Sequence, residues 1–408
     1  MEKLNMNTTW EIVKLDRFFV IKKGQTITKK DSNPGIYPVI LGGREPAYYI
    51  DKYNHTGKAI VVSRSGASAG YVSFWNEPIF VTDGFLIEPK DDVNYEFVYY
   101  LLKLKQSQLL GSQRGAAIPH VTPNLLYNVQ AFFPPLPTQK QIASILSAYD
   151  NLIENNNKRI KILEQMAENL YKEWFVRFRF PGHETTRFVP SNMGKIPSTF
   201  TLAKMQDVFE YYIGGGWGED EYSSDFPVEA KVIRGADFPF VERGDLGTCP
   251  NRFHKESNYK ARKLEPGDII LEVSGGTAEQ PVGRTILVSQ QMLDRFNGQV
   301  ICASFCKLVR LKKEKISPVY FYYWMQFLYE TRIIDRFQLQ STGIINFKFE
   351  YFLKKGDVML PPSEIMKKFE DLVSPIHAQI EKLAMETENL IKQRDLLLPR
   401  LMSGKLAV

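Results

Sequence analysis

The fold of this chain is decided by two stretches, PPLPTQKQIASILSAYDNLIENNNKRIKILEQM at residues 134–166 and PPSEIMKKFEDLVSPIHAQIEKLAMETENLIKQ at residues 361–393, which align without a gap. Each begins with two prolines, which cannot continue a central strand. Apolar residues then recur at helical spacing. Each stretch therefore predicts a strand end followed by one long helix, and the chain contains this unit twice.

The apolar residues of both predicted helices follow a heptad pattern with two alternating seam positions. The seam of the first helix comprises Tyr149, Ile153, Asn156, Ile160, Leu163, Ala167, Leu170 and Trp174, and that of the second comprises Ile376, Ile380, Leu383, Thr387, Leu390, Arg394, Leu397 and Leu401. Equivalent helices of a repeated chain can pack antiparallel across a pseudo-twofold axis, which would bury both seams. The alternative is that each helix packs only on its own domain.

Capping residues suggest where these helices begin. Ser374 and Pro375 form a favourable N-cap and first helical residue, and Asp150 could cap the first helix similarly. We therefore expect a short helix to end near Ser374 and the long one to begin there. About 25 helical residues span about 37 Å, close to one turn of B-DNA at about 34–36 Å, so two domains on such helices could address adjacent turns of a duplex.

The sequence before each long helix is also repeated. Four segments recur in the same order: WEIVKL from Trp10 as FTLAKM from Phe200, KAIVVSRSG from Lys58 as GDIILEVSG from Gly267, FVYY from Phe97 as YFYY from Tyr320, and IPHV from Ile118 as IINF from Ile344. Most are strand-like runs that enter Gly- or Pro-containing turns. We predict an α/β (α+β) chain with two strand-rich domains, separated by two long antiparallel coiled-coil helices in a pseudo-twofold repeat.

The chain length of 408 residues suits two domains with connecting elements. The predicted boundaries are residues 1–135 for the first strand-rich domain, 136–180 for the first helical spacer, 181–197 for a linker, 198–360 for the second domain and 361–408 for the second spacer. The linker, PGHETTRFVPSNMGKIP, is rich in turn formers and lacks periodicity.

Composition places the chain among globular proteins, with 44% hydrophobic and 24% charged residues. No apolar run approaches the roughly 20 residues of a membrane span, and the first residues lack a secretory signal, so we expect no membrane segment and a cytoplasmic location. Cys249, Cys302 and Cys306 are expected to be reduced thiols in the core. The net charge of +6 permits a nucleic-acid partner without requiring one.

The motifs of common catalytic sites are missing. The sequence has no phosphate-binding loop, no Asn-Pro-Pro-Tyr methyltransferase motif and no Gly-x-Gly-x-x-Gly after a strand. Its five histidines are scattered, which argues against a metal cluster or a Cys–His nucleophile pair. Asp268 and Glu272 would suit part of a nuclease metal site, but the expected lysine is Ser274. We expect no catalytic residue, metal or cofactor, with an unrecognised nuclease as a lesser alternative.

The repeats, the junction PPLPTQKQIASIL, the helix exit NLYKEWFVRFRFPG and the C-terminal LLLPRLMSGKLAV together resemble a type I restriction-modification specificity subunit over essentially the whole chain. The resemblance implies two target-recognition domains that each read half of a split double-stranded DNA target, and helical spacers that dock two adenine methyltransferase subunits. S-adenosylmethionine and ATP would belong to partner subunits, and whether two restriction subunits join is left open. The chief alternative is a stand-alone DNA-binding regulator or scaffold with a coiled-coil spacer.

Reading bases requires side chains with forked donors or acceptors on loops, and holding phosphates requires Lys, Arg, hydroxyls and backbone amides. The candidate DNA contacts are Gln25, Thr26, Lys29, Arg44, Arg64, Ser65, Ser68, Arg114 and His120 in the first domain, and Arg234, Ser274, Thr277, Gln280, Arg284, Thr342, Asn346 and Lys348 in the second. The loop SRSGASAG is favoured, because small residues admit phosphate and Arg64 could fork onto guanine. For each residue the alternative is a solvated loop position or turn former.

Overall fold

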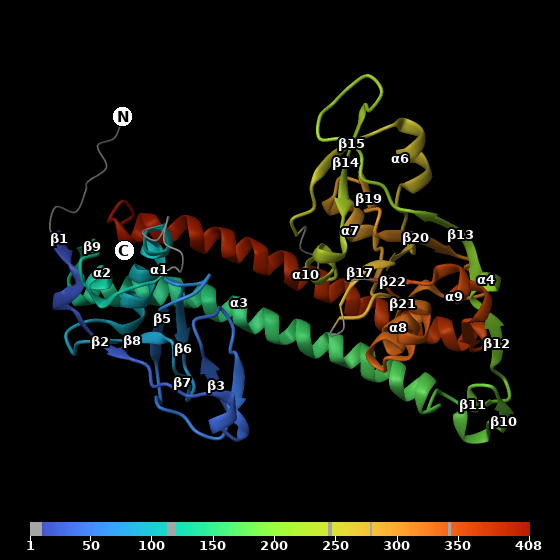
Figure 1. The fold of residues 1–408 in the computed structure, drawn as a ribbon, viewed down its shortest axis with the longest axis horizontal. Helices are drawn as coiled ribbons and strands as arrows, with labels where there is room; N and C mark the ends of the chain where they lie inside the picture. The colour runs from blue at the N-terminus through green and yellow to red at the C-terminus, as the bar shows by residue number, and fades with distance from the viewer. Residues whose placement is uncertain (1–9, 112–119, 244–246, 278–279, 342–343) are drawn as a thin grey trace. The chain divides into compact units, whose positions relative to one another are not determined.

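A computed structural model describes residues 10–111, 120–243, 247–277, 280–341 and 344–408 (Figure 1). The chain divides into two compact units: unit 1 comprises Met1–Glu154 and Asn389–Val408, and unit 2 comprises Asn155–Glu388. Two long helices, α3 (Leu136–Tyr171) and α10 (Ser363–Met402), contribute to both units. Each unit therefore contains a strand-rich domain and a portion of both long helices.

In its described residues, unit 1 contains three small sheets. The antiparallel four-stranded sheet has the order β2 (Phe19–Lys23), β8 (Gly84–Pro89), β5 (Ala59–Ser63) and β6 (Val72–Trp75). The second sheet has the order β4 (Tyr48–Ile50), β3 (Pro34–Ile40) and β7 (Phe80–Val81). The third sheet pairs β1 (Glu11–Lys14) with β9 (Gln130–Phe133). Strand β3 runs antiparallel to β4 and parallel to β7. Helix α1 (Tyr95–Gly111) contacts the four-stranded sheet, and α2 (Pro123–Tyr127) precedes β9.

Unit 2 repeats this plan strand for strand. Its sheets have the orders β13 (Phe209–Gly214), β20 (Cys306–Leu311), β16 (Ile269–Glu272), β18 (Thr285–Leu287); β15 (Asn251–His254), β14 (Val228–Ile233), β19 (Val300–Cys302); and β12 (Thr201–Lys204) with β23 (Asp357–Leu360). Strand β14 is again antiparallel to one neighbour and parallel to the other. Helices α8 (Pro318–Glu330) and α9 (Phe349–Lys355) take the places of α1 and α2. The predicted internal repeat is confirmed.

Unit 2 also has elements of its own. Strands β17 (Ser274–Gly276), β22 (Ile344–Phe347) and β21 (Gln338–Ser341) form a further sheet in this order. Short helices α5 (Phe238–Val241), α6 (Glu256–Arg262) and α7 (Gln290–Arg295) lie in the connections between strands. Within residues 181–197, which the sequence predicts to be a linker, β10 (Phe188–Ser191) and β11 (Gly194–Pro197) form an antiparallel hairpin. Four-residue strands are too short to leave a clear period in the sequence.

The long helices pack antiparallel in each unit. In unit 2, Ile160 of α3 packs against Ile380 and Leu383 of α10. In unit 1, which contains the start of α3 and the end of α10, Arg394 Nη1 donates a hydrogen bond of 2.6 Å to Asp150 Oδ1. The predicted seam residues are buried or half-buried, while most residues between them are exposed. The coiled-coil prediction is therefore confirmed, and each end of the pair also joins the core of a strand-rich domain.

The predicted helix starts at Ser374 and Asp150 are wrong. Helix α10 runs without interruption through Ser374 and Pro375, and α3 runs through Asp150. A proline inside a helix costs about 3 kcal/mol. The helix continues because Val373, just before the proline, and Ile380, after it, are buried in the seam, and this packing outweighs the local penalty.

The three cysteines are buried and form no disulfide, as predicted. Burial raises the pKa of Cys249 and of Cys302 to about 12, so both remain as unreactive thiols at neutral pH. In the part of the chain that the structure describes, no helix is both long and apolar enough to cross a membrane.

Candidate nucleic-acid interface

In unit 1, segments that are distant in the sequence meet at the end of β5. Arg64 N donates a hydrogen bond to Asp83 O (3.2 Å), and Val121 N donates one to Arg64 O (2.8 Å). Ser65 and His120 form an isolated antiparallel bridge. Three of the predicted DNA contacts, Arg64, Ser65 and His120, are therefore neighbours, and Asp83 lies beside them.

Asp83 organises this group through its carboxylate. Arg64 Nε lies 2.7 Å from Asp83 Oδ1, and the Ser65 hydroxyl donates to the other carboxylate oxygen. The Arg64 side chain is 28% exposed. A guanidinium has five N–H donors, so a carboxylate on Nε can fix its direction while other donors point elsewhere. Asp83 is not among the residues predicted from the sequence, because those were residue types that attract phosphate or bases.

Two further loops reach the same edge of unit 1. Gln25 N donates a hydrogen bond to Val81 O (2.9 Å), and Val81 lies two residues before Asp83 in the chain. Ser63 Oγ donates to the carbonyl oxygen of Gly43 (3.4 Å), the residue before Arg44. We call the group Gln25, Arg44, Arg64, Ser65, Asp83 and His120 recognition edge 1. Arg44, Gln25 and His120 are exposed.

The other candidates of unit 1 are less closely tied to this edge. Thr26 follows Gln25 and is exposed, and Ser68 lies in the turn that follows Arg64, where its carbonyl accepts from Tyr71 N (2.9 Å). Lys29 lies in the 3-10 turn η2 (Lys29–Asp31), which leads into the other sheet. Arg114 lies outside the described residues.

Unit 2 has the same backbone frame. Ser274 of β17 pairs with Asn346 of β22, and Ser274 Oγ donates to Asn346 Oδ1 (2.7 Å). Phe347 N donates to Val273 O (2.8 Å), as Val121 N donates to Arg64 O in unit 1. The pair Ser274·Asn346 is thus the structural equivalent of Ser65·His120, and the predicted alignment of IPHV with IINF is confirmed.

The ion pair of unit 1 has no equivalent at this position in unit 2. Val273 occupies the place of Arg64, and its N–H donates to Phe305 O (2.9 Å), just as Arg64 N donates to Asp83 O. Phe305 therefore occupies the place of Asp83, and it is 64% exposed. Phe305 is not among the residues predicted from the sequence, because those are all polar.

A second aromatic residue marks the same region. Gly24 N and Gly215 N each donate to the carbonyl that opens the next strand, at 3.0 and 2.9 Å, so the two glycines are equivalent. A Cβ at either would overlap a backbone carbonyl, which explains the glycine. Two residues on, Thr26 of unit 1 corresponds to Trp217, which is 42% exposed and carries the Arg252 guanidinium 4.8 Å from its ring centroid. We call Trp217, Val273, Ser274, Phe305 and Asn346 recognition edge 2.

Two predicted arginines of unit 2 are already bound inside the domain. Arg234 donates to both carboxylate oxygens of Asp237, at 2.9 and 3.0 Å. Arg284 donates to both oxygens of Glu272, at 2.8 and 2.6 Å, and to Gly235 O at 2.8 Å. Breaking such a pair in a buried setting costs about 3–5 kcal/mol. Both guanidinium groups are hydrogen-bonded to carboxylates of the same domain, and their contact with DNA stays a prediction.

The remaining candidates of unit 2 lie in turns near β17 and β22. Thr277 N donates to Gln280 O (2.7 Å) and Gln280 N to Thr277 Oγ1 (3.1 Å), so both shape an exposed turn. Lys348 follows β22, with Nζ 5.9 Å from the Tyr351 ring centroid. Thr342 lies outside the described residues. Their roles as DNA contacts stay predictions.

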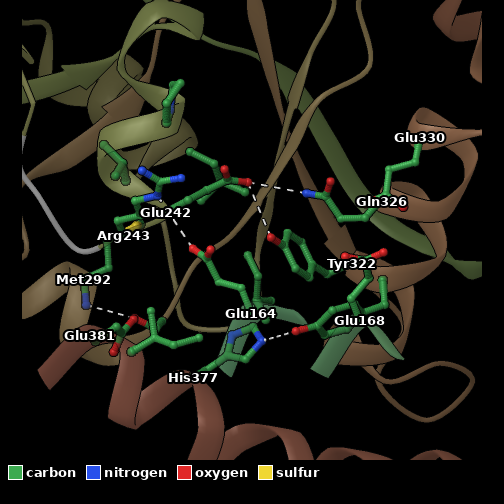
Figure 2. A pocket seen from close by; sticks show the side chains of 17 residues that line it. Glu164, Glu168, Glu242, Arg243, Met292, Tyr322, Gln326, Glu330, His377 and Glu381 are labelled. Carbon is green, nitrogen blue, oxygen red and sulfur yellow. Dashed lines mark hydrogen bonds and ion pairs between the residues drawn. The ribbon is translucent and has the colours of Figure 1, made fainter. Parts of the chain in front are cut away.

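A pocket in unit 2 lies elsewhere and is acidic (Figure 2). Its lining includes Glu164, Glu168, Glu242, Glu330 and Glu381, together with Arg243, Tyr322, Tyr323, Gln326 and His377. Desolvation raises the pKa of Glu242 to about 7, and burial lowers that of His377 to about 4. The carboxyl groups of this lining that are ionised would repel a phosphate backbone. At this pocket α8 contacts the helix pair, because Tyr323 Oη lies 2.7 Å from His377 Nε2 of α10.

The carboxylates of the nuclease hypothesis are also accounted for. Asp268 accepts two hydrogen bonds from Arg310, at 2.8 and 2.9 Å, and Glu272 is bound by Arg284. Among the described residues, no group of three or more His, Cys, Asp or Glu could hold a metal ion. The two carboxylates therefore serve as internal partners of arginines.

Comparisons with known proteins agree with this geometry. A family model described as the type I restriction modification DNA specificity domain matches residues 7–165. The MjaIX specificity subunit of Methanocaldococcus jannaschii is 28% identical over 361 residues, covering 86% of this chain and 78% of the relative. The MjaVIII specificity subunit of the same organism is 24% identical over 426 residues, covering 100% and 95%.

A solved structure has the same fold. The S subunit of a type I restriction-modification system from M. genitalium superposes with a TM-score of 0.62 at 18% identity, covering 98% of each chain. This likeness concerns the fold, in which two equivalent domains accompany two long helices. Residues 7–165 thus match the type I restriction modification DNA specificity domain, and the chain is similar along its whole length to type I restriction enzyme specificity subunits.

Proposed function

We propose that recognition edges 1 and 2 each read one half of a split double-stranded DNA target. The observation that carries this proposal is the pair of equivalent bridges, Ser65·His120 and Ser274·Asn346, set in the same backbone frame. A shared frame presents both edges to DNA in the same way, whereas different side chains on it give different base preferences. The chain supplies the specificity of its system and is not itself an enzyme.

The helix pair is proposed to dock two methyltransferase subunits. Large apolar side chains lie exposed on the outer faces of the long helices, away from the seam: Ile145, Leu152, Ile162 and Met166 on α3, and Leu372, Met385, Ile391 and Leu396 on α10. Exposed apolar patches of this kind are covered by partner proteins. Ile145 and Leu372 occupy equivalent positions of the repeat, which supports two equivalent docking sites. S-adenosylmethionine and ATP are proposed to bind the partner subunits, and a restriction subunit is a further candidate partner.

The helices are also proposed to set the length of the unread gap between the half-sites. Around Ile153 and Leu390 the seam residue is half-buried and its immediate neighbours are exposed, so an insertion there disturbs no domain core. One heptad added after each of these residues preserves the seam and lengthens each helix by about 10 Å, or about three base pairs. Methylation of targets that differ only in gap length should then show a longer optimal gap. An unchanged optimum in an active, folded complex would refute the ruler.

Selection from random duplexes tests the function itself. The chain, purified with its methyltransferase subunits, should enrich two short specified runs separated by an unspecified gap of fixed length. One continuous specified site, or no sequence preference, would contradict the proposal. The stand-alone regulator makes a different prediction, because it would select the same sequence with equal affinity when the methyltransferase is absent.

A further inference from the structure

In unit 2, one row of side chains crosses the sheet β17-β22-β21. Ser274 is the cross-strand partner of Asn346, and Asn346 is the partner of Leu339. Cross-strand partners project from the same face of a sheet, and the hydrogen bond between Ser274 and Asn346 agrees with this. Leu339 is 55% exposed on that face. A polar pair and an apolar side chain thus stand side by side.

Phe305 borders the same row. Its backbone accepts from Val273, the residue before Ser274. At the equivalent place in unit 1, the Asp83 side chain reaches the Ser65 hydroxyl. The backbone of Phe305 is bonded to the residue before Ser274, so Phe305 lies at the position from which Asp83 reaches Ser65 in unit 1. We call Ser274, Phe305, Leu339 and Asn346 the mixed face.

The mixed face matches one kind of base pair. In the major groove, adenine presents an acceptor at N7 and a donor at N6, which an Asn side chain can pair with, and thymine presents an apolar C5-methyl group. A G·C pair has no such methyl group. Covering exposed Phe and Leu side chains with an apolar group lowers the free energy, because apolar surface is removed from water.

We propose that the mixed face reads an A·T base pair of the second half-site, with Asn346 hydrogen-bonded to adenine and Phe305 against the thymine methyl group. Leu339 completes the apolar wall around the methyl group. This inference rests on the proposed function, since it assigns the base chemistry of recognition edge 2. Recognition edge 1 has His120 and Asp83 at the positions of Asn346 and Phe305 and provides no such wall.

Deoxyuridine tests the methyl contact directly, because it pairs like thymine and lacks the C5-methyl group. Duplexes carrying the selected target, with each thymine replaced singly by deoxyuridine, are titrated with the chain in complex with methyltransferase. At one position of the second half-site, binding should weaken about fourfold, the factor that corresponds to about 0.8 kcal/mol for one buried methyl group. Replacements in the first half-site should cause no such loss of affinity at Arg64 or Asp83, because these charged side chains form no apolar contact with a methyl group.

Variants connect this effect to the residue. Phe305→Ala should weaken binding to the thymine duplex and abolish the deoxyuridine penalty, whereas Phe305→Leu should retain part of it. Phe188→Ala is the matched control, because Phe188 is 48% exposed in the β10–β11 hairpin of the same unit. The control should leave both affinities unchanged.

Two results would overturn the inference and leave the proposed function standing. One is selective binding of a split target with no deoxyuridine penalty at any position of the second half-site. The other is a Phe305→Ala variant that keeps the full penalty. Loss of sequence preference in the unmodified complex would instead refute the proposed function.

Discussion

The α3–α10 pair ends in aliphatic side chains in unit 1 and in aromatic side chains in unit 2. Ile142 and Leu398 join the core of unit 1, whereas their repeat equivalents in unit 2 are Phe369 and Tyr171. The rings of Tyr171, Trp174, Phe175 and Tyr323 lie 5.1–6.1 Å from Phe369, measured between centroids. The repeat therefore preserves which positions close the core, while the volume that fills each position differs.

The polar contacts at the two ends differ in the same way. In unit 1, Tyr100 donates to Asp150 (2.6 Å), which also accepts from Arg394. In unit 2, the equivalent tyrosine, Tyr323, meets His377 at the position of Asp150, and Ala167 stands at the position of Arg394. A tyrosine joins the domain to the helix in both units, but the partner is charged in one and a neutral base in the other.

The largest expected effect comes from removing the aromatic end. Phe369→Ala should cost about 3–5 kcal/mol of stability in unit 2, because a fully buried ring leaves a cavity, and Ile142→Ala should cost about 2–5 kcal/mol in unit 1. Leu372→Ala, on the exposed side of α10, should change stability by less than about 0.5 kcal/mol. Urea denaturation of the three variants measures the difference. Equal small losses would mean that the helix ends are not part of the domain cores.

The second effect depends on pH and is specific to unit 2. The folded pKa of His377 is about 4, below the unfolded value of about 6.5, so the unfolded chain binds the proton more readily. Stability should therefore fall as the pH drops from about 6.5 to about 4, by at most about 3 kcal/mol from this group. The raised pKa values of Glu242, Glu330 and Glu381 act in the opposite direction.

The variant His377→Gln isolates the histidine from these carboxyl groups, because glutamine does not titrate. The melting temperature of the native chain should fall more steeply than that of the variant between pH 6.5 and 4. Parallel curves for the two proteins would show that His377 does not remain neutral in the folded state.

The third effect is the loss of the charged contact in unit 1. Asp150→Asn removes one of the two carboxylates that contact Arg394, the other being Asp395, and should cost about 1–3 kcal/mol because the guanidinium, whose side chain is 23% exposed, is left partly desolvated with one partner fewer. Adding Arg394→Gln to this variant should recover part of the loss. Thermal unfolding of both variants checks this, and a double variant less stable than Asp150→Asn alone would argue against the under-compensated charge of Arg394 as the cause.

The two units also differ in which of their features could be predicted from the sequence. The repeat, the helices and the seam could be predicted, because a period of seven and an ungapped alignment are properties of the sequence itself. Ser274·Asn346 and Ser65·His120 could be aligned for the same reason. The continuity of α10 at Pro375 could not be predicted, because it depends on tertiary packing against α3 and the core of unit 2.

The candidate sites were predicted less completely than the fold. Arg284 looks like a free loop cation in sequence, and only the structure shows its bidentate contact with Glu272. Phe305 and Trp217 were overlooked because an aromatic residue in a single sequence gives no sign of its exposure. Their places at recognition edge 2 emerge only when the backbone hydrogen bonds of both units are compared.

The most direct test of the central claim is a double dissociation between the two edges. Each base pair of the selected target is substituted in turn, and methylation is measured for complexes that contain the native chain, Arg64→Ala or Asn346→Ala. Arg64→Ala should change discrimination only in the first half-site and Asn346→Ala only in the second, each by about 1–3 kcal/mol for a base-edge contact. If both variants weaken every target equally, these residues hold phosphate or the fold, and the two edges do not read separate half-sites.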